Sequence, residues 1–499
     1  MPSTEPAARP AGATSRRRAP AWLVVSVLAA AQFMIAVDAT IVNVPLPQIA
    51  AALDITKESD LQWVVNAYLL AFGGFLLLGG KAADRYGRRA VFTLGVGLFG
   101  VASLVGGLAQ TPGLLIAARA AQGLGGALMT PAALSLLTIS FPEGEERNRA
   151  LAIFAAVAGS GGALGLVLGG VLTDGLDWRW VFFANAPIAA VVILLALRAV
   201  GESRDDEAGS FDLAGAVTVT GGLVALVYAL TQANDTGWAT VQTVGLLTGS
   251  AVLLGAFAVL QARGKNPMMP PRVIGRRSVA GADLGMVFVY TATVGVFFFL
   301  TLYLQQIHGY SAIRTGFAFL PLSAATMAAG AQAPRLMARF GARPLVIGGL
   351  LLMAAGLLLE ARISPDGGYT GVVLGPLLLV GAGTGFAFVA ITAAGVAGVP
   401  PEDAGIASAL VNAGGPLGAA LSLAIFTAIV NARLDALRGS VTDPTSLAAA
   451  TTSGWSWALV TGAAVVALGA VICGLLIPRT PRGATTETAP AVTSPAGVA

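Results

Sequence analysis

Fourteen stretches of apolar residues, each close to the length of a bilayer crossing, follow one another along the chain with short polar segments between them. A transmembrane α-helix needs about 20 such residues. Lipid offers no partner to exposed backbone groups, so successive spans of this kind fold as helices. The sequence therefore predicts an all-α membrane protein with fourteen transmembrane helices. The predicted spans are residues 22–44, 62–80, 90–110, 113–138, 150–172, 180–199, 213–231, 241–262, 279–303, 315–333, 344–362, 371–396, 404–430 and 455–477.

The composition agrees with a polytopic membrane protein and argues against several kinds of chemistry. Charged residues make up 11% of the chain, against about 25% in soluble domains, and the mean hydropathy is +0.79. The single cysteine, Cys473, excludes an intramolecular disulfide, and the single histidine, His308, in a predicted outer loop, argues against histidine-based metal or nucleophilic chemistry. The scattered basic residues form no nucleic-acid-binding face. The sequence predicts no catalytic residue, no metal and no cofactor.

The distribution of basic residues predicts the orientation. With the N-terminus inside, six of the 29 lysine and arginine residues fall in outer loops and one, Arg119, falls within a span. Short loops rich in Lys and Arg stay in the cytoplasm, so both termini are predicted to be cytoplasmic. The chain ends, residues 1–20 and 479–499, have a composition typical of disorder. Three arginines before Trp22 also suit a signal peptide, but the span that follows is long enough to cross the bilayer.

An internal repeat divides the chain. Arg85-Tyr-Gly-Arg-Arg89 returns as Arg339-Phe-Gly-Ala-Arg343, after the second and the tenth predicted spans. An offset of eight spans rather than six predicts two six-helix bundles with two inserted helices between them. The predicted units are residues 21–200, a linker with the inserted helices at 201–276, and residues 277–478. Parallel repeats are known in secondary transporters, with the substrate site between the repeats.

Five stretches resemble the motifs of a known family. They are Asp38–Pro47 (DATIVNVPLP) in the first span, Gly80–Arg89 (GKAADRYGRR) after the second, Arg119–Gly123 (RAAQG) in the fourth, Gly161–Gly170 in the fifth and Trp178–Pro187 (WRWVFFANAP) at the sixth. In this order they resemble the fourteen-span drug/proton antiporters of the major facilitator superfamily, over essentially all of residues 20–478. The resemblance implies the major facilitator fold and transport rather than enzymatic activity.

The stretch 80–89 is predicted to be a short cytoplasmic loop. Gly80 is expected to let the second helix end against a neighbour, and Gly87 permits a turn with positive φ. Asp84 is expected to accept hydrogen bonds from Arg88 or from a neighbouring helix N-terminus. The second copy has alanine in place of this aspartate, so the contact that holds the cytoplasmic side closed is expected to be weaker in the second half of the chain. The resemblance implies a cytoplasmic gate formed by Gly80, Asp84, Arg85, Gly87, Arg88 and Arg89.

Asp38 and Arg119 are the predicted proton-coupling residues. An acidic residue inside a span costs ~2.5–3.5 kcal/mol, so it normally faces a cavity or a partner. Each of the two lies about six residues from the outer end of its span, or ~9 Å deep, and the resemblance implies that their helices border one cavity. Burial favours the neutral acid while a nearby guanidinium favours the carboxylate, so a modest rearrangement would move a proton on or off. A fixed structural ion pair, or contact of Asp38 with the loop before the second helix, are the alternatives.

The fifth span carries a row of glycines. Gly161, Gly165 and Gly169 recur every four residues, with Gly170 beside the last. Small residues at this spacing let two helices pack closely, and the resemblance implies an antiporter helix here. The family has a proline at the position of Leu166, so a straighter helix is expected.

Polar and aromatic side chains within the spans are candidates for a substrate cavity, because an aromatic pocket with few polar groups suits an apolar organic compound. Packing in the core or against lipid is the alternative for the aromatic residues, and interhelical hydrogen bonding for the amides. Asp283 is expected to snorkel at the cytoplasmic end of its span, and Glu360 to lie near the outer end of a peripheral or packing helix. The cavity candidates are Asn43, Gln122, Tyr290, Phe297, Phe298, Phe299, Gln305, Gln306 and Asn412.

These features predict a monomeric secondary transporter in a bacterial inner membrane, which exports hydrophobic or amphipathic drug-like compounds in exchange for protons by alternating access. The chain has no GxxxxGK[ST] phosphate-binding loop, so ATP coupling has no support. A proton symporter and a dedicated exporter of one metabolite are alternatives with the same fold. A membrane-embedded enzyme and a non-transporting sensor are alternatives from other classes.

Overall fold

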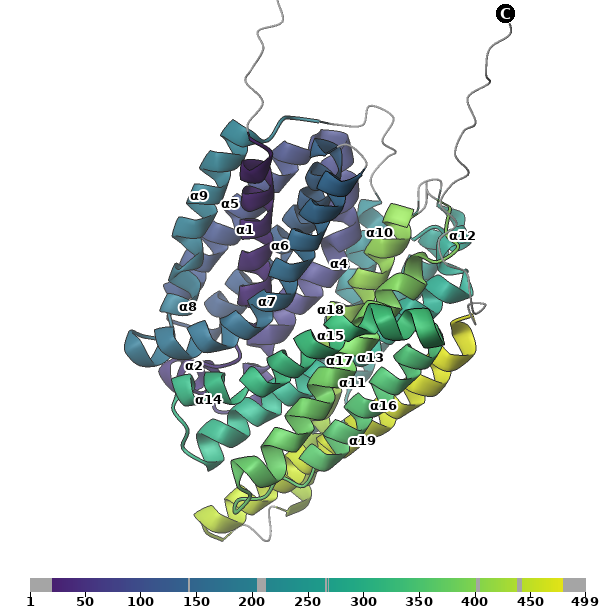
Figure 1. Ribbon diagram of the computed structural model, residues 1–499. Coiled ribbons are helices and arrows are strands. Elements are labelled where there is room, and N and C mark those ends of the chain that lie inside the picture. Colours follow the sequence, from purple (N-terminus) through teal and green to yellow (C-terminus); the bar gives the residue numbers. More distant parts are fainter. Residues whose placement is uncertain are drawn as a thin grey trace, which may run out of the picture.

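The structure of the 499-residue chain is a computed structural model. It describes residues 20–141, 144–203, 212–264, 267, 269–400, 404–437 and 442–478. Within these ranges every regular element is a helix (Figure 1). Apart from Pro20, the ends that the sequence predicts to be disordered lie outside the described residues.

The N-terminal bundle contains six spans, and two short helices lie between the first two of them. The short helices are α2 (Leu46–Ala52) and α3 (Glu58–Leu61). The sixth span is divided at Ala184 into a short turn and a longer helix. The spans are α1 (Ala21–Ile41), α4 (Trp63–Tyr86), α5 (Arg88–Gly107), α6 (Pro112–Ser140), α7 (Glu145–Gly175) and α8–α9 (Trp180–Phe183 and Asn185–Ala199).

Two inserted helices, α10 (Leu213–Thr236) and α11 (Val241–Arg263), follow the first bundle, and the short α12 (Pro271–Ile274) precedes the second. Helix α10 packs on α11, α4 and α18, so it touches both bundles. Helix α11 has the smallest buried share of the candidate spans, 11%. The second bundle consists of α13 with η1 (Arg277–Leu302 and Tyr303–Ile307), α14 with α15 (Ala312–Ala318 and Leu320–Phe340), α16 (Ala342–Glu360), η2 with α17 (Tyr369–Val373 and Leu374–Val396), α18 (Ala404–Leu437) and α19 (Pro444–Leu476).

The helices agree with the predicted count of spans. Thirteen helices of the described part are long and apolar enough to cross a membrane. The remaining predicted span, the fifth (150–172), corresponds to α7, whose charged first turn includes Glu145 and Glu146 and whose shorter apolar part is Leu164–Gly175. The fold is therefore the predicted one, two six-helix bundles with two inserted helices.

The buried apolar residues show where the two bundles meet. Helix α1 begins and helix α19 ends at the same end of the molecule, which we call the terminal end. We call the opposite end the distal end (Figure 1). The largest buried cluster contains much of the second bundle, but its members from the first bundle, such as Ile41, Val64 and Phe182, lie in the distal half. The terminal half of the first bundle has a separate cluster around Leu28, Phe92 and Leu137. The largest apolar core thus joins the bundles at the distal side, and a smaller cluster around Leu410 reaches Leu77 of α4 nearer the terminal end.

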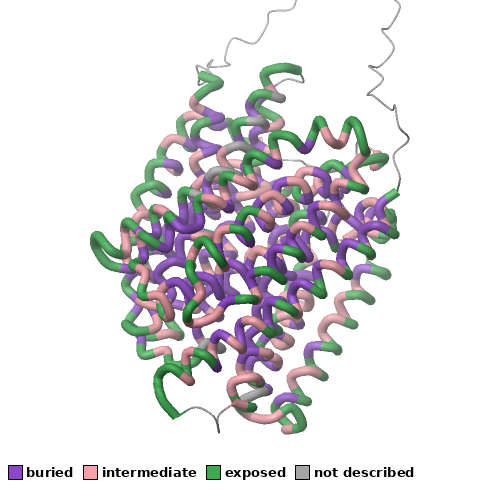
Figure 2. The backbone as a smooth tube through the Cα atoms, turned by 60° about the horizontal axis from the view of Figure 1, so that its bottom comes forward, coloured by how far each residue is buried: buried purple, intermediate pink, exposed green. Residues whose placement is uncertain are grey.

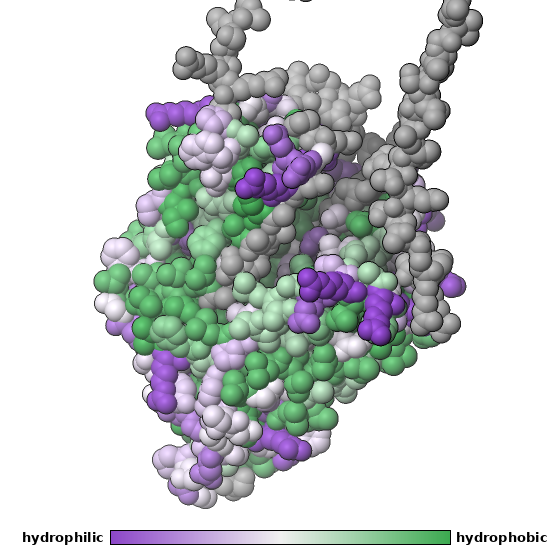
Figure 3. All heavy atoms as spheres, viewed as in Figure 1, coloured by the Kyte–Doolittle hydropathy of each residue, from purple (hydrophilic) through white to green (hydrophobic). Residues whose placement is uncertain are grey.

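The surface of the helices is apolar. Leu94, Val252 and Leu475 are 64, 65 and 72% exposed, and hydrophobic side chains cover most of the coloured face in Figure 3. Buried residues concentrate in the interior (Figure 2). Exposed apolar patches of this extent mark a surface that contacts lipid.

Candidate functional site

An ion pair between α1 and α6 lies in the interior of the first bundle. The Arg119 Nη1 donates to Asp38 Oδ2 at 2.6 Å, and the Asp38 side chain is fully buried. The Arg119 Nε donates to the backbone oxygen of Val64 at 3.0 Å, at the start of α4. One guanidinium therefore connects three helices of the bundle.

Three uncharged side chains complete the hydrogen bonding of this pair. The Gln122 and Asn185 amides both donate to Asp38 Oδ1, at 3.1 and 3.0 Å. The same two amides contact the Ser103 hydroxyl at 2.8 and 3.0 Å. The Gln122 Oε1 in turn accepts from Arg119 Nη1 at 3.0 Å. Both carboxylate oxygens of Asp38 thus have donors, supplied by α6 and α9.

The aromatic ring of Tyr68 covers one face of the guanidinium. The Cζ atom of Arg119 lies 4.4 Å from the ring centroid, within the range of a cation–π interaction. The Tyr68 hydroxyl is buried and has no hydrogen-bond partner in the described part of the chain. The ring of Phe72 stacks on Tyr68 at a centroid distance of 5.9 Å. The charged group is therefore bounded by an aromatic wall on α4.

The buried charges of this network are paired and hydrogen-bonded. Burying two charges is tolerated when the pair and its remaining donors and acceptors are satisfied, as they are here for Asp38. Adding a proton to Asp38 removes the charge that holds Arg119. The guanidinium then keeps Val64 and Gln122 as its acceptors, so the connection between α1 and α6 is the one that weakens.

The sequence predicted part of this network. The structure brings together Asp38, Arg119 and Gln122, but Gln122 contacts the ion pair rather than standing apart as a cavity residue. Contact of Asp38 with the loop before the second helix does not occur, because its carboxylate is taken up by α6 and α9. Sequence reasoning missed Asn185 and Ser103. Asn185 lies in the quoted stretch Trp178–Pro187, and an amide in so apolar a span was the available signal.

The glycines of α7 form the contact with α1 next to this network. A Cβ at Gly161 would lie 2.5 Å from the Cβ of Ala36, and one at Gly165 or Gly169 would lie 2.6 Å from the backbone oxygen of Val37 or Ile41. The Thr40 hydroxyl donates to the Gly162 oxygen at 3.0 Å across the same contact. The three glycines thus let α7 approach the turn of α1 that carries Asp38. Gly170, in contrast, faces α14 of the second bundle.

The predicted loop at 80–89 is largely helical. Helix α4 continues to Tyr86 and α5 begins at Arg88, so Gly87, with φ 104°, is the only residue between them. The prediction that α4 ends at Gly80 is wrong, because Gly79 and not Gly80 makes the close approach, to the backbone of Ala127 on α6. Helix α4 continues past Lys81 and Asp84 and ends at the positive-φ Gly87.

The charged residues of this junction hold α4, α5 and the end of α9 together at the terminal end. Arg88 donates to Asp84 Oδ1 through Nη2 at 2.9 Å and through Nε at 3.1 Å. Arg89 Nε lies 3.5 Å from the Glu202 carboxylate, and its Nη1 donates to the Val200 oxygen at 3.3 Å. Of the other two basic residues, Arg85 lies 6.0 Å from the centroid of the Tyr86 ring, and Lys81 donates to the Pro267 oxygen at 2.9 Å.

The second copy of this motif keeps the backbone but not the ion pairs. Gly341, between α15 and α16, has φ 86°. Ala338 and Ala342 stand where the first copy has Asp84 and Arg88. The described residues of this junction form no ion pair, and Arg339 instead lies 5.1 Å from the centroid of the Phe340 ring.

Polar contacts at the distal end join the two bundles. The Asp174 carboxylate of α7 accepts from the backbone N–H groups of Ala312 and Ile313 at 3.2 and 2.8 Å, at the start of α14. Gly316 of α14 faces the backbone of Leu166 on α7. These contacts hold α7 of the first bundle against α14 of the second.

A second set of distal contacts involves a predicted cavity residue. The Gln305 Nε2 donates to the Val44 oxygen at 2.6 Å, and the Gln48 Nε2 donates to Gln305 Oε1 at 3.1 Å. Gln305 therefore connects the two bundles at the distal end. Asn43, in the turn that follows α1, donates to the backbone oxygens of Ala39 and Thr40 in the last turn of that helix.

Of the aromatic candidates on α13, two are fully buried and two are half-buried. Phe298 and Phe299 are fully buried and pack edge to face at 5.4 Å, so they belong to the core. Phe297 packs on Phe319 at 5.3 Å. Tyr290 lies against Gly415 of α18. Three further residues from the sequence analysis are exposed or half-buried. Gln306 is exposed at the distal end, and Asn412 is exposed and donates to the Ser408 oxygen. Asp283 is half-buried beside Gly414.

Glu360 is the acidic residue whose position departs most from expectation. It is 1% exposed, and neither of its oxygens has a hydrogen-bond partner in the described residues. It lies at the distal end of α16, which packs on α17 and α19. The helix packs as expected, but the carboxyl lies in the core rather than at the periphery. His308, in the distal loop, contacts the rings of Tyr303 and Tyr310.

Comparison with known proteins agrees with the fold and the motifs. The chain is 40% identical to a puromycin resistance protein of Streptomyces alboniger over 91% of both chains. It is 41% identical to a cephamycin export protein of Amycolatopsis lactamdurans, over 80% of this chain and 83% of the relative. It is 37% identical to the multidrug resistance protein Stp of Mycobacterium tuberculosis, over 83% and 77%.

Solved structures show the same fold at low sequence identity. A bacterial homologue of the human lysosomal transporter Spinster, inward-facing and unoccupied, superposes with a TM-score of 0.64 at 17% identity, over 93% of this chain and 98% of the other. An auto-inhibited POT family peptide transporter superposes with a TM-score of 0.66 at 14% identity, over 91% and 96%. The sequence model of the Major Facilitator Superfamily matches residues 28–423. The resemblance that the motifs indicate is thereby confirmed, and the chain belongs to the Major Facilitator Superfamily.

Proposed function

We propose that this transporter exports hydrophobic or amphipathic compounds in exchange for protons, with Asp38 as the proton-binding residue. The observation that carries the proposal is the buried Asp38–Arg119 pair, whose partners reach α1, α4, α5, α6 and α9. A proton on Asp38 ends the ion pair and weakens the connection between α1 and α6. An inward proton gradient supplies the energy, since moving one charge through 100 mV is worth about 2.3 kcal/mol.

In this proposal the terminal end and the distal end of the molecule act as gates. The distal contacts of Asp174 and Gln305 hold the outer side closed, and the terminal end, which the basic residues assign to the cytoplasm, is the side from which the substrate enters. When the outer side opens, the pairs formed by Arg88 and Arg89 with Asp84 and Glu202 keep the first bundle rigid at the cytoplasmic side. This role of Asp84 is a proposal that rests on the contacts alone.

The wall beside the ion pair supports a substrate of mixed character. The half-buried Phe72 offers its ring, and the free Tyr68 hydroxyl offers one hydrogen bond. Tyr290 and Asn412 are the proposed contributions from the second bundle. An aromatic surface with few polar groups suits an apolar organic molecule.

Transport in proteoliposomes with an imposed pH gradient tests the coupling. The parent is expected to move substrate against its concentration gradient while protons move in the opposite direction, as reported by a dye for lumenal pH. Asp38→Asn is expected to lose the response to the gradient. Glu360→Gln is the matched control, because it neutralises a carboxyl that is equally buried but lies outside the network. A parent that ignores the gradient would contradict proton antiport, and an Asp38→Asn variant that keeps the response would contradict the role of Asp38.

A dedicated exporter of one compound is the second candidate, because several relatives are named for single antibiotics. These include the puromycin, cephamycin and lincomycin proteins. A panel of puromycin, lincomycin and a lipophilic dye cation distinguishes the two. Export of several members supports a multidrug exporter, and export of one alone supports a dedicated one.

A further inference from the structure

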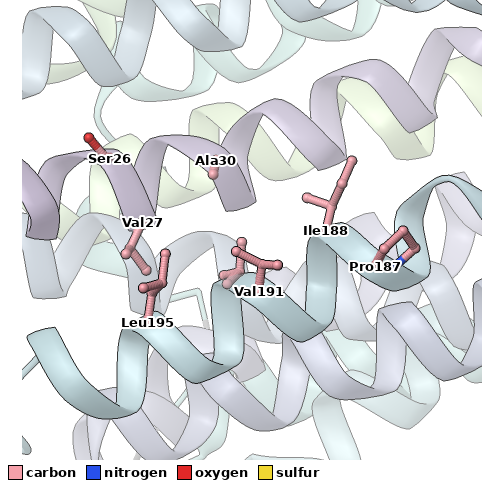
Figure 4. Close-up of a pocket in the computed structure, with 8 residues that line it drawn as sticks. Ser26, Val27, Ala30, Pro187, Ile188, Val191 and Leu195 are labelled. Carbon is pink, nitrogen blue, oxygen red and sulfur yellow. The ribbon is translucent and has the colours of Figure 1, made fainter.

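An apolar groove lies between α1 and α9 on the outside of the first bundle. Its volume is about 450 Å³. Side chains from the two helices face each other across it (Figure 4). Its walls contain one polar side chain, Ser26, among seven apolar ones. The lining residues are Ser26, Val27 and Ala30 of α1 and Pro187, Ile188, Val191, Val192 and Leu195 of α9.

The groove is separate from the ion-pair network. None of the residues that contact Asp38 lines it. Val191 and Ile188 are 53 and 37% exposed, so the groove opens on the surface that faces lipid. Its volume falls within the 300–1,000 Å³ of ordinary ligand sites, and its walls offer contact for a hydrocarbon chain rather than hydrogen bonds.

A positive charge stands at the terminal end of the groove. Arg198 lies in the last turn of α9, one turn beyond Leu195 and on the face that carries Ile188 and Val191. Its side chain is exposed and forms no hydrogen bond or ion pair with the described residues. Trp22, 68% exposed at the start of α1, lies at the same end. Tryptophan at a helix end is typical of the headgroup level of a bilayer, so the groove runs from that level into the hydrocarbon.

We propose that this groove is a binding site for one anionic phospholipid, with an acyl chain between α1 and α9 and the phosphate at Arg198. The walls complement a hydrocarbon chain, and the free guanidinium complements the charge. Basic residues at the membrane surface attract anionic lipid headgroups, and guanidinium matches phosphate geometry. A lipid bound here contacts α1 at Ala30, about two helical turns before Asp38.

Native mass spectrometry of the full chain in detergent tests the site. The probes are phosphatidylglycerol and phosphatidylcholine with identical acyl chains, each added at equal concentration. The parent is expected to retain phosphatidylglycerol in preference to phosphatidylcholine. Arg198→Gln is expected to lower retention of phosphatidylglycerol about fivefold and leave phosphatidylcholine unchanged. Val191→Trp, which fills the groove, is expected to lower retention of both lipids.

Two control variants separate this site from general lipid adhesion. Arg263→Gln removes an exposed arginine from the last turn of α11, at the same end of the bundle. Leu197→Trp adds the same bulk at a 52% exposed position of α9 that does not line the groove. Both are expected to retain lipid as the parent does. If Val191→Trp proves unfolded by its melting curve, Ala30→Phe fills the groove from the other helix.

Three results would overturn the proposal. The first is equal retention of the two lipids by the parent. The second is equal loss from Arg198→Gln and Arg263→Gln, which would make the effect one of net charge. The third is a dimer in the parent that Val191→Trp converts to monomer, because the groove would then be occupied by a second copy of the chain.

Discussion

The two bundles share a way of packing helices but differ in the charges that they bury. In the first, Gly161, Gly165 and Gly169 of α7 admit α1. In the second, a glycine row on α18 admits α13 in the same manner. The first bundle buries an aspartate with full hydrogen bonding. The second buries Glu360 without a partner among the described residues.

The difference separates what the fold requires from what the chemistry requires. Aromatic and aliphatic side chains, such as Phe298, Phe299 and Trp455, fill the second bundle, so this helix arrangement forms without a buried ion pair. Replacing a buried pair by apolar residues is often neutral or stabilising. The pair in the first bundle therefore adds little that packing would not supply, which supports the functional role that we propose for it.

Breaking the ion pair from one side gives the largest expected effect. Arg119→Met leaves the Asp38 charge buried without its cation, which costs about 3–5 kcal/mol. The free energy of unfolding in mixed micelles measures the loss. Arg263→Met, at an exposed site, is the matched control and is expected to unfold as the parent does. Equal stability of Arg119→Met and the parent would show that the two bundles do not differ in the way described.

Filling the glycine contacts tests the feature that the bundles share. A Cβ at Gly165 would meet the Val37 oxygen at 2.6 Å, and one at Gly418 would meet the Val287 Cγ1 at 2.6 Å. Gly165→Ala and Gly418→Ala are each expected to destabilise by about 1–3 kcal/mol, because over-packing forces the helices apart. Thermal unfolding measures both. Gly375→Ala, with no atom within 4 Å of the new Cβ, is the control, and a large loss in one bundle alone would contradict the shared packing.

The sequence was most informative where a single property decides the structure. Apolar length decides a span, so each predicted span has its helix. Extensions beyond the apolar core follow local signals instead: α19 begins at Pro444, eleven residues before its predicted start, because Asp443 and Ser446 form a capping box. Helix α4 continues past the first charged residues of its motif and ends at the positive-φ Gly87.

The site was harder to predict because helices that are apolar all round do not reveal which face is buried. The depth of Asp38 and Arg119 follows from counting residues, and the family resemblance implied that their helices border one cavity. Asn185 and Ser103 contact them from α9 and α5, and no spacing within either helix indicates this face. The burial of Glu360 was missed for the same reason, although its depth at the end of α16 was predicted.

Removing the buried carboxyl of Glu360, which has no partner among the described residues, is expected to stabilise the protein. Glu360→Leu replaces two unpartnered oxygens in an apolar core, and relief of one such group is worth about 1 kcal/mol or more. The melting temperature is expected to rise, and export is expected to continue at the parent rate. A variant that is more stable but no longer exports would show that the second bundle also carries a functional carboxyl, and the contrast between the bundles would fail.

The smallest expected change in stability concerns the two copies of the repeated motif. The Asp84–Arg88 pair is half-exposed and spans four residues, so Asp84→Ala is expected to cost less than ~0.5 kcal/mol. If the pair serves the cytoplasmic gate, the export rate falls much further than this small loss explains.

The second copy of the motif offers the reverse experiment. Ala338→Asp alone is expected to change neither the stability nor the export rate, because position 342 is alanine where the first copy has Arg88. Adding Ala342→Arg recreates the pair in the second bundle, and slower export by that double variant would extend gating to both halves. Unchanged export by Asp84→Ala would leave the first copy of the motif a stabiliser of the α4–α5 turn with no part in the gate.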